Sequence, residues 1–254
     1  MSHAATPQDL VGKVAFITGS AKNMGQQFAL ALARRGCDVV IHHRNNPEEA
    51  EKTSQEIQAL GRKTLVVRGE LTSVSMIENI FAQILSTFGH IDIVINNAGM
   101  VLKKSITEIS EHEYDQCFQI NAKVPFFVMK ECAKHMADNG RIINIGTTLL
   151  AITTGGYSVY AGSKAPLEDF TRAVAKEVGS RGITVNTIAP GPIDTPFFHG
   201  QETKESVAFF STLSVAGRLG TVNDIVPVVE FIASPGSQWI TAQTIFVNGG
   251  VIAR

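Results

Sequence analysis

The sequence lacks the features that are typical of nucleic-acid-binding, membrane and secreted proteins. Basic residues are in no surplus, since 22 Lys and Arg stand against 23 Asp and Glu for a net charge of −1. A nearly neutral chain has no general attraction for nucleic acid or for an anionic membrane surface, so neither is an expected partner. No apolar run is long enough to cross a bilayer. The opening residues, MSHAATPQDL, lack the basic and then apolar pattern of a signal peptide.

Cysteine is also scarce. Cys37, Cys117 and Cys132 are odd in number and lack metal-ligand spacing, so they predict neither a disulfide framework nor a metal site. His42 and His43 are adjacent on an expected strand, where they point to opposite faces and cannot chelate one metal together. Buried thiols in a reducing compartment fit the cysteines best, and the expected location is cytoplasmic.

What is present indicates one globular α/β domain. The 254 residues are 44% hydrophobic and 18% charged, which is ordinary for such a protein. We expect a flexible N-terminal tail over residues 1–11 and a single domain over residues 12–254, without internal repeats or a linker. Short apolar runs alternate with helical patterns along the chain, which predicts a parallel, doubly wound sheet. The expected strands cover residues 13–18, 38–43, 63–68, 91–95, 141–145, 183–188 and 244–247.

Tyr160 and Lys164 are the pair around which the functional prediction is built. Four residues apart, they fall on one face of a helix. A free tyrosine has a pKa of about 10, and a lysine cation close by lowers it toward the range of a useful general acid or base. A pair of this kind is also common on surface helices, so the prediction needs a cofactor site and a hydroxyl partner.

A candidate cofactor site follows the first expected strand. The strand over residues 13–18 runs into Gly19-Ser20-Ala21-Lys22-Asn23-Met24-Gly25, and a helix follows to about Arg35. A helix N-terminus offers unpaired N–H groups and the positive end of the helix dipole to a pyrophosphate. An ordinary tight turn between strand and helix is the alternative.

The end of the second expected strand bears on the choice of cofactor. It reads His42-His43-Arg44, without the acid that usually holds the ribose 2′-hydroxyl of NAD. An arginine suits the 2′-phosphate of NADP, and Lys22 could supply a second positive charge. We therefore expect NADP(H) to be preferred and NAD(H) to be possible. A solvated loop arginine is the alternative for Arg44.

Two later segments have unusual features. Asn121 lies within a long helical pattern over residues 110–136, although asparagine is a mediocre helix former. It indicates either a capping or exposed position, or a local irregularity of the helix that the site uses. Residues 193–215 carry Phe197, Phe198, Phe209 and Phe210 and are expected to form a mobile lid with an apolar inner face.

Five motifs in order give the chain a family resemblance. They are the glycine loop, Asn96-Asn97-Ala98-Gly99, Asn121, Tyr160 with Lys164, and Pro190-Gly191. Together they resemble the single-domain branch of the short-chain dehydrogenase/reductase family, from Gly12 to Arg254. Within that family the overall sequence looks most like the 3-oxoacyl-thioester reductases. The resemblance implies a Rossmann-type fold, a nicotinamide cofactor and the interconversion of a carbonyl and an alcohol.

The resemblance also implies roles for particular residues. Tyr160 would donate or accept the proton, Lys164 would lower its pKa and hold the nicotinamide ribose, and Asn121 would hold Lys164 through water. Glu70 and Leu71 would flank the adenine, residues 97–99 would pack along the adenosine, and Ile193 and Thr195 would meet the carboxamide. The full set of cofactor-binding residues so implied is Gly19, Ser20, Lys22, Asn23, Met24, Gly25, Arg44, Glu70, Leu71, Asn97, Ala98, Gly99, Tyr160, Lys164, Pro190, Gly191, Ile193 and Thr195.

Three positions depart from the family pattern. The middle glycine of the loop is Asn23, which tolerates positive φ better than other non-glycine residues. The usual aspartate near the adenine is Glu70. The catalytic serine, thirteen residues before the tyrosine, is Thr147, which keeps the hydroxyl but adds a methyl group and a stiffer χ1. Thr147 is the predicted carbonyl-orienting residue, and a structural role at the strand end is the alternative.

The expected function is NADPH-dependent oxidoreduction of a small-molecule carbonyl or alcohol, with Tyr160 as general acid/base. One alternative is a non-catalytic nucleotide-sensing or scaffold protein on the same fold. Another is a lyase or epimerase that uses the cofactor without net redox change. The long helix through Asn121, the Tyr160 helix and the C-terminal strand resemble those that pack across two-fold interfaces in the family, so a homotetramer is expected.

Overall fold

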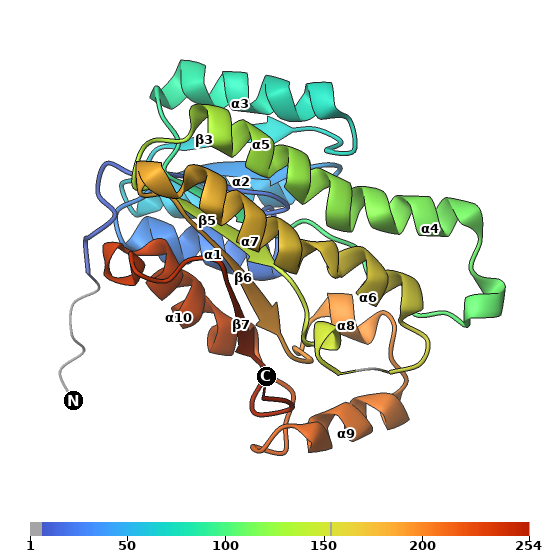
Figure 1. The fold of residues 1–254 in the computed structure, drawn as a ribbon. Helices are drawn as coiled ribbons and strands as arrows, with labels where there is room; N and C mark the ends of the chain where they lie inside the picture. Colours follow the sequence, from blue (N-terminus) through green and yellow to red (C-terminus); the bar gives the residue numbers. More distant parts are fainter. Residues whose placement is uncertain (1–6, 153, 254) are drawn as a thin grey trace, which may run out of the picture.

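A computed structural model describes residues 7–152 and 154–253 and has a parallel β-sheet at its centre. The described residues form one seven-stranded sheet in the order β3-β2-β1-β4-β5-β6-β7, with every neighbouring pair parallel (Figure 1). The doubly wound Rossmann-type architecture predicted from the sequence is therefore confirmed. The strands are β1 (Val14–Ile17), β2 (Asp38–His43), β3 (Thr64–Arg68), β4 (Ile93–Asn96), β5 (Arg141–Ile145), β6 (Thr184–Pro190) and β7 (Gln243–Val247).

Helices cover both faces of the sheet. One layer consists of α1 (Asn23–Arg34), α2 (Pro47–Ala59) and α10 (Val222–Ala233), and the other of α3 (Val74–Phe88), α5 (Val124–His135) and α7 (Pro166–Val178) (Figure 1). The central strands are buried on both sides, which is why they read as continuous apolar runs. Two apolar clusters result, one under each helical layer.

The expected N-terminal tail needs a correction at its end. Leu10 is buried, and its N–H donates to the carbonyl of Arg35 over 3.1 Å. The Asp9 carboxylate pairs with the Arg35 guanidinium in two hydrogen bonds. Asp9 and Leu10 thus pack against the domain, because Arg35 at the end of α1 pairs with Asp9 and the apolar cluster under α1 includes Leu10. Residues 1–6 of the predicted tail lie outside the described residues.

The long helix expected over residues 110–136 has the irregularity that Asn121 indicates. α4 (Glu111–Phe118) leads into a π-helical turn over Gln119–Lys123, and α5 follows directly. Single π-turns inside helices commonly occur at functional sites. The helix of Tyr160 is likewise divided, because Pro166 ends α6 (Ser158–Lys164) and begins α7.

The expected lid contains two helices, α8 (Pro196–His199) and α9 (Lys204–Leu213), with α9 standing away from the sheet (Figure 1). Its mobility stays a prediction. Cys37, Cys117 and Cys132 are all buried free thiols, as expected. Across the two described ranges, no helix combines the length and apolar character that crossing a membrane requires.

Candidate active site

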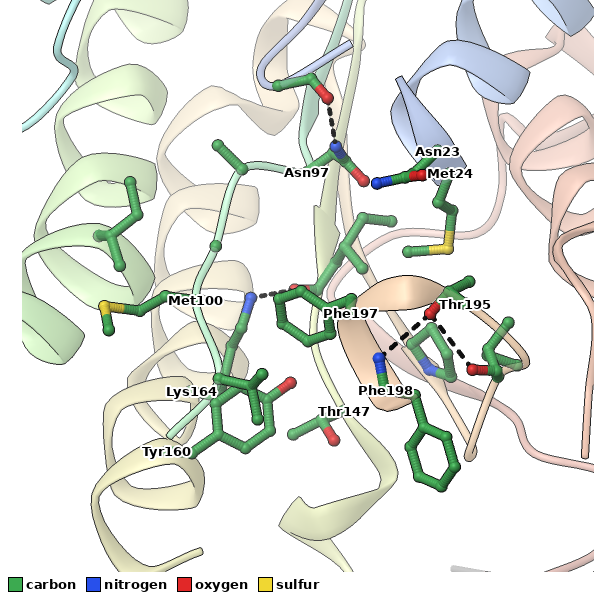
Figure 2. A pocket seen from close by; sticks show the side chains of 18 of the residues that line it. Asn23, Met24, Asn97, Met100, Thr147, Tyr160, Lys164, Thr195, Phe197 and Phe198 are labelled. Atoms are coloured by element: carbon green, nitrogen blue, oxygen red, sulfur yellow. Dashed lines mark hydrogen bonds between the residues drawn. The ribbon is translucent and has the colours of Figure 1, made fainter. Parts of the chain in front are cut away.

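One cavity runs along the carboxyl ends of the strands and holds nearly all of the predicted site residues. It has a volume of about 860 Å³ and extends from the glycine loop, past Tyr160, to the lid. It lies where the strand order reverses between β1 and β4, the place where open parallel sheets bind their ligands. Figure 2 shows Asn23, Met24 and Asn97 toward one end of it and Tyr160, Thr147 and Phe198 toward the other.

The glycine loop has the geometry of a phosphate cradle. Gly19 and Asn23 both have positive φ, +67° and +54°, so Asn23 adopts the left-handed conformation that glycine favours. A Cβ on Gly25 would lie 2.4 Å from the Gly19 carbonyl oxygen, so only glycine fits at that position. Among the described residues, no side chain caps the N-terminus of α1. The loop and helix end therefore suit a pyrophosphate.

Asn97 supports the loop from the neighbouring strand. Its Nδ2 donates to the carbonyl oxygens of Thr18 and Gly19 over 3.0 and 3.2 Å. The Thr18 hydroxyl in turn accepts from the N–H groups of Asn97 and Ala98. The Asn97 amide thus holds the glycine loop in place, and the packing of residues 97–99 along the adenosine stays a prediction.

The strand ends beside the loop carry the candidate adenosine residues. Arg44 and Glu70, both largely exposed, face one another across β2 and β3 with Nη1 and Oε2 3.3 Å apart. His42, which the sequence reasoning left without a role, ties this region together. Its Nδ1 accepts from the Gly19 N–H, and its Nε2 lies 3.0 Å from the Gly69 carbonyl oxygen. Burial lowers the pKa of His42 to about 4, so the ring is neutral and bridges the two segments.

Tyr160, Lys164 and Thr147 meet at the centre of the cavity. All three are more than nine-tenths buried, and Figure 2 shows the Tyr160 hydroxyl and Thr147 on the same side of the cavity, with Lys164 beside Tyr160. The Lys164 Nζ donates to the Ile145 carbonyl over 2.7 Å. The Thr147 Oγ1 accepts from the Leu149 N–H, so its own proton can be donated into the cavity.

The pKa shift expected for Tyr160 is wrong in direction. Burial raises the pKa of the phenol to about 12, and the hydrogen bond with Thr147 opposes this only in part. Burial also lowers the pKa of Lys164 to about 8, so its ammonium form still prevails at neutral pH. Desolvation decides both pKa values here, because it disfavours each charged form. Tyr160 is consequently a protonated phenol, which is a proton donor.

Two predicted site residues lie behind the cavity wall. Ser20 is fully buried, and its hydroxyl donates to the Ile17 carbonyl and accepts from the His42 N–H, so it braces the loop and does not face a ligand. Asn121 hydrogen-bonds Met100 through both its amide atoms and donates to Ser163. Among the described residues it supports the segment opposite Lys164 and makes no direct hydrogen bond to Lys164.

All the other predicted site residues line the cavity: Gly19, Lys22, Asn23, Met24, Gly25, Arg44, Glu70, Leu71, Asn97, Ala98, Gly99, Thr147, Tyr160, Lys164, Pro190, Gly191, Ile193 and Thr195. The sequence reasoning missed Tyr157, which lies one helical turn before Tyr160 with ring centroids 6.1 Å apart. It also missed Lys103 and Glu202, which pair at the lid.

Comparison with known proteins agrees with this geometry. A family model described as enoyl-(acyl carrier protein) reductase matches residues 19–252. The hydroxynaphthalene reductase-like protein Arp2 of Metarhizium brunneum is 34% identical over 268 residues, which cover 99% of each chain. Among solved structures, a putative dehydrogenase from Burkholderia cenocepacia with bound NADP superposes with a TM-score of 0.94 at 40% identity, covering 98% of this chain and 96% of that one.

A second solved structure is also similar over almost the whole chain. The landomycin C-6 ketoreductase LanV, solved with bound NADP and rabelomycin, superposes with a TM-score of 0.86 at 30% identity, covering 96% of this chain and 97% of that one. The matches span almost the whole chain and include the glycine loop, the Tyr160 helix and the lid. The chain therefore belongs to the single-domain branch of the short-chain dehydrogenase/reductase family of oxidoreductases.

Proposed function

We propose that this protein is an NADPH-dependent reductase of bulky aromatic ketones, with Tyr160 as the proton donor. The observation that carries the proposal is the placement of the Tyr160 and Thr147 hydroxyls in a cavity continuous with the glycine loop. The NADP-bound structures of similar proteins support the cofactor. The finer resemblance to 3-oxoacyl-thioester reductases stays a prediction.

The chemistry divides between the cofactor and the chain. A bound nicotinamide supplies the hydride for the carbonyl carbon. The Thr147 hydroxyl, whose oxygen already accepts from Leu149, donates to the carbonyl oxygen and stabilises the charge that develops there. Tyr160 then gives its phenolic proton to that oxygen. Lys164, anchored on the Ile145 carbonyl, would hold the nicotinamide ribose, and its ammonium charge would favour the tyrosinate that remains.

The substrate end of the cavity favours a flat, apolar ketone. The rings of Tyr157 and Phe197 flank Tyr160, and those of Phe198 and Phe210 pack edge to face beyond them. Met100, Leu149 and Ile152 also line the cavity. Aromatic walls bind flat rings by burial and by offset or edge-on stacking. The names of the similar proteins, a hydroxynaphthalene reductase-like protein and an angucycline-type ketoreductase, agree with this class.

NADPH oxidation against a panel of carbonyl compounds tests the proposal. The panel contains a bicyclic aromatic ketone such as 1-tetralone, an acyclic aliphatic ketone and a 3-oxoacyl thioester. An additional ring of about 100 Å² of buried apolar surface contributes about 2.5 kcal/mol, so kcat/KM for the bicyclic ketone should exceed that for the aliphatic ketone at least tenfold. NADPH binding without turnover of any member would favour the nucleotide-sensing alternative. Product formed without net NADPH consumption would favour the lyase or epimerase.

Replacing Arg44 with alanine should weaken NADPH binding at least tenfold and leave NADH binding nearly unchanged. A charge-assisted hydrogen bond to the 2′-phosphate contributes about 1.5–3 kcal/mol, less where water competes. The present partner of Arg44 is an exposed carboxylate, an ion pair of about 0–1 kcal/mol that a phosphate can replace. Fluorescence titration of both cofactors measures the effect. Arg172→Ala, which removes another exposed and paired arginine, is the control. Unchanged cofactor preference in the Arg44 variant would contradict the assignment.

The proposal includes a cytoplasmic homotetramer. Exposed apolar side chains on α4 and α5, Tyr114 and Phe126, and the exposed Trp239 before β7 are available for contacts between copies. Closed two-fold contacts through two such surfaces give a tetramer with D2 symmetry. Light scattering at micromolar concentration should return four times the 27.3 kDa chain mass. A monomer mass would rule this assembly out.

A further inference from the structure

Glu202 is a carboxylate whose side chain is completely buried, although it belongs to the lid. It lies in the turn between α8 and α9, and its side chain is 0% exposed. It accepts a hydrogen bond from the Lys103 ammonium over 2.5 Å and another from the Tyr157 hydroxyl. Lys103 follows β4 and Tyr157 precedes α6, so three segments distant in sequence meet at one carboxylate.

Neighbouring contacts join the same three segments. The Lys103 N–H donates to the Gln201 side chain over 3.2 Å, and the Lys104 N–H donates to the Gly156 carbonyl over 2.8 Å. The Lys103 ammonium also lies 5.5 Å from the centre of the Tyr157 ring, within the range of a cation–π contact. The lid is thus attached to the cavity wall by a cluster of polar contacts centred on Glu202.

The cluster depends on the charge of Glu202. Burial alone would raise the pKa of this carboxyl, but hydrogen bonds from Lys103, Ser206 and Tyr157 outweigh burial and lower it. Burial and the Glu202 carboxylate together raise the pKa of Tyr157 well above its ordinary value. Tyr157 is therefore a neutral donor to a charged acceptor. The Glu202 side chain is shielded from water and that of Lys103 is 29% exposed, so losing this pair costs more than losing an exposed pair.

The position of Tyr157 matters because of its neighbour. Its ring lies 6.1 Å from the Tyr160 ring on one side, and the Phe197 ring of α8 lies 6.5 Å from Tyr160. Figure 2 shows Phe197 in the neighbourhood of Tyr160 and Lys164, and it lines the cavity. Both neighbours of the proton donor thus depend on the lid, since α8 carries Phe197 and Glu202 fixes Tyr157.

We propose that Glu202 is a positioning residue of the substrate site. Through its contacts with Lys103 and Tyr157 it holds the lid in place. It thereby positions the rings of Tyr157 and Phe197, which hold the ketone against Tyr160. This inference rests on the proposed reductase function. The Glu202–Lys103 ion pair is then the contact that closes the lid. Binding of an aromatic substrate depends on this pair, although the pair touches neither the substrate nor the cofactor.

Kinetics of the full-length Glu202→Gln variant test the proposal. Glutamine keeps the shape and can still accept from Tyr157, but it leaves the Lys103 charge unpaired. KM for the bicyclic aromatic ketone should rise at least about tenfold, whereas the Kd for NADPH should stay within about twofold, because the glycine loop lies at the other end of the cavity. Tyr157→Phe should raise KM less, since the ring remains. Asp169→Asn, which removes one partner of an exposed ion pair on α7, is the control and should change neither constant.

A double variant separates positioning from general destabilisation. Lys103→Met combined with Glu202→Gln removes both charges, so its KM should lie below that of Glu202→Gln alone. An unchanged KM in Glu202→Gln would overturn the proposal. So would a parallel loss of NADPH affinity and of melting temperature, because that pattern indicates a merely structural residue.

Trypsin cleavage after Lys204 gives a readout that does not need turnover. Lys204 begins α9 directly after the cluster, and cleavage there should be at least about fivefold faster in Glu202→Gln than in the wild type if the lid has been released. If the wild-type protein reduces no member of the carbonyl panel, the proposed function fails, and the cleavage rates still decide the role of Glu202. Equal cleavage rates in the two proteins would overturn it.

Discussion

Tyr160→Phe should lower kcat for ketone reduction by about 10²–10⁴, the usual contribution of a positioned general acid. The phenol is more than nine-tenths buried, and burial raises its pKa to about 12, so at neutral pH it carries the proton that the reduction requires. Phenylalanine keeps the ring between Tyr157 and Phe197 and removes only the hydroxyl. Stopped-flow or steady-state measurement of NADPH oxidation reports the loss.

The pH dependence of the rates of ketone reduction and of alcohol oxidation is a second test of the role of Tyr160. Reduction uses the protonated phenol, so Tyr160 should impose no fall in rate between pH 6 and pH 8. Alcohol oxidation uses the phenolate, whose population rises about tenfold per pH unit below the pKa, so oxidation should become faster as the pH rises. Thr87→Val removes an exposed hydroxyl on α3 and should leave both directions unchanged. A Tyr160→Phe variant with a tenth or more of the wild-type kcat would exclude Tyr160 as the proton donor.

Thr147→Val should lower kcat by about 10²–10³, or about 2.7–4 kcal/mol of transition-state stabilisation, if Thr147 donates to the developing oxyanion. Valine keeps the branched shape and removes the hydroxyl, so the comparison isolates the hydrogen bond. Thr147→Ala should show a similar loss. Thr147→Ser should retain activity or raise it, because serine keeps the donor, drops a methyl group and regains rotamer freedom. Initial rates with saturating NADPH measure all three variants.

The neighbouring threonine supplies a control for Thr147. Thr148 is also buried, but its hydroxyl donates to the Ala189 carbonyl over 3.3 Å, so Thr148→Val should affect stability more than kcat. If Thr147→Val turned over ketone as fast as wild type while Tyr160→Phe did not, Thr147 would be structural. Thr148 or a residue of the lid would then be the next candidate for orienting the carbonyl.

The sequence by itself determined the sheet, the glycine loop and the candidate reacting pair. Each of these features depends on a short stretch of sequence. The periods of strands and helices, the positive φ at Gly19 and Asn23, and the spacing of Tyr160 and Lys164 each involve residues close together in the chain. The irregularity at Asn121 was predictable for the same reason, because the side chain competes for backbone groups where it stands.

The tertiary structure alone decided the pKa of Tyr160, the roles of Ser20 and His42, and the cluster at Glu202. A pKa depends on the desolvation contributed by every segment that packs around the group, and here burial outweighs the lysine that the sequence places nearby. Ser20 and His42 hold segments that are distant in the chain, since Ser20 accepts from the His42 N–H and the His42 ring bridges Gly19 and Gly69. Glu202 meets Lys103 and Tyr157 from 99 and 45 residues away, and no local pattern encodes such a contact, because it exists only once the lid has folded onto the sheet.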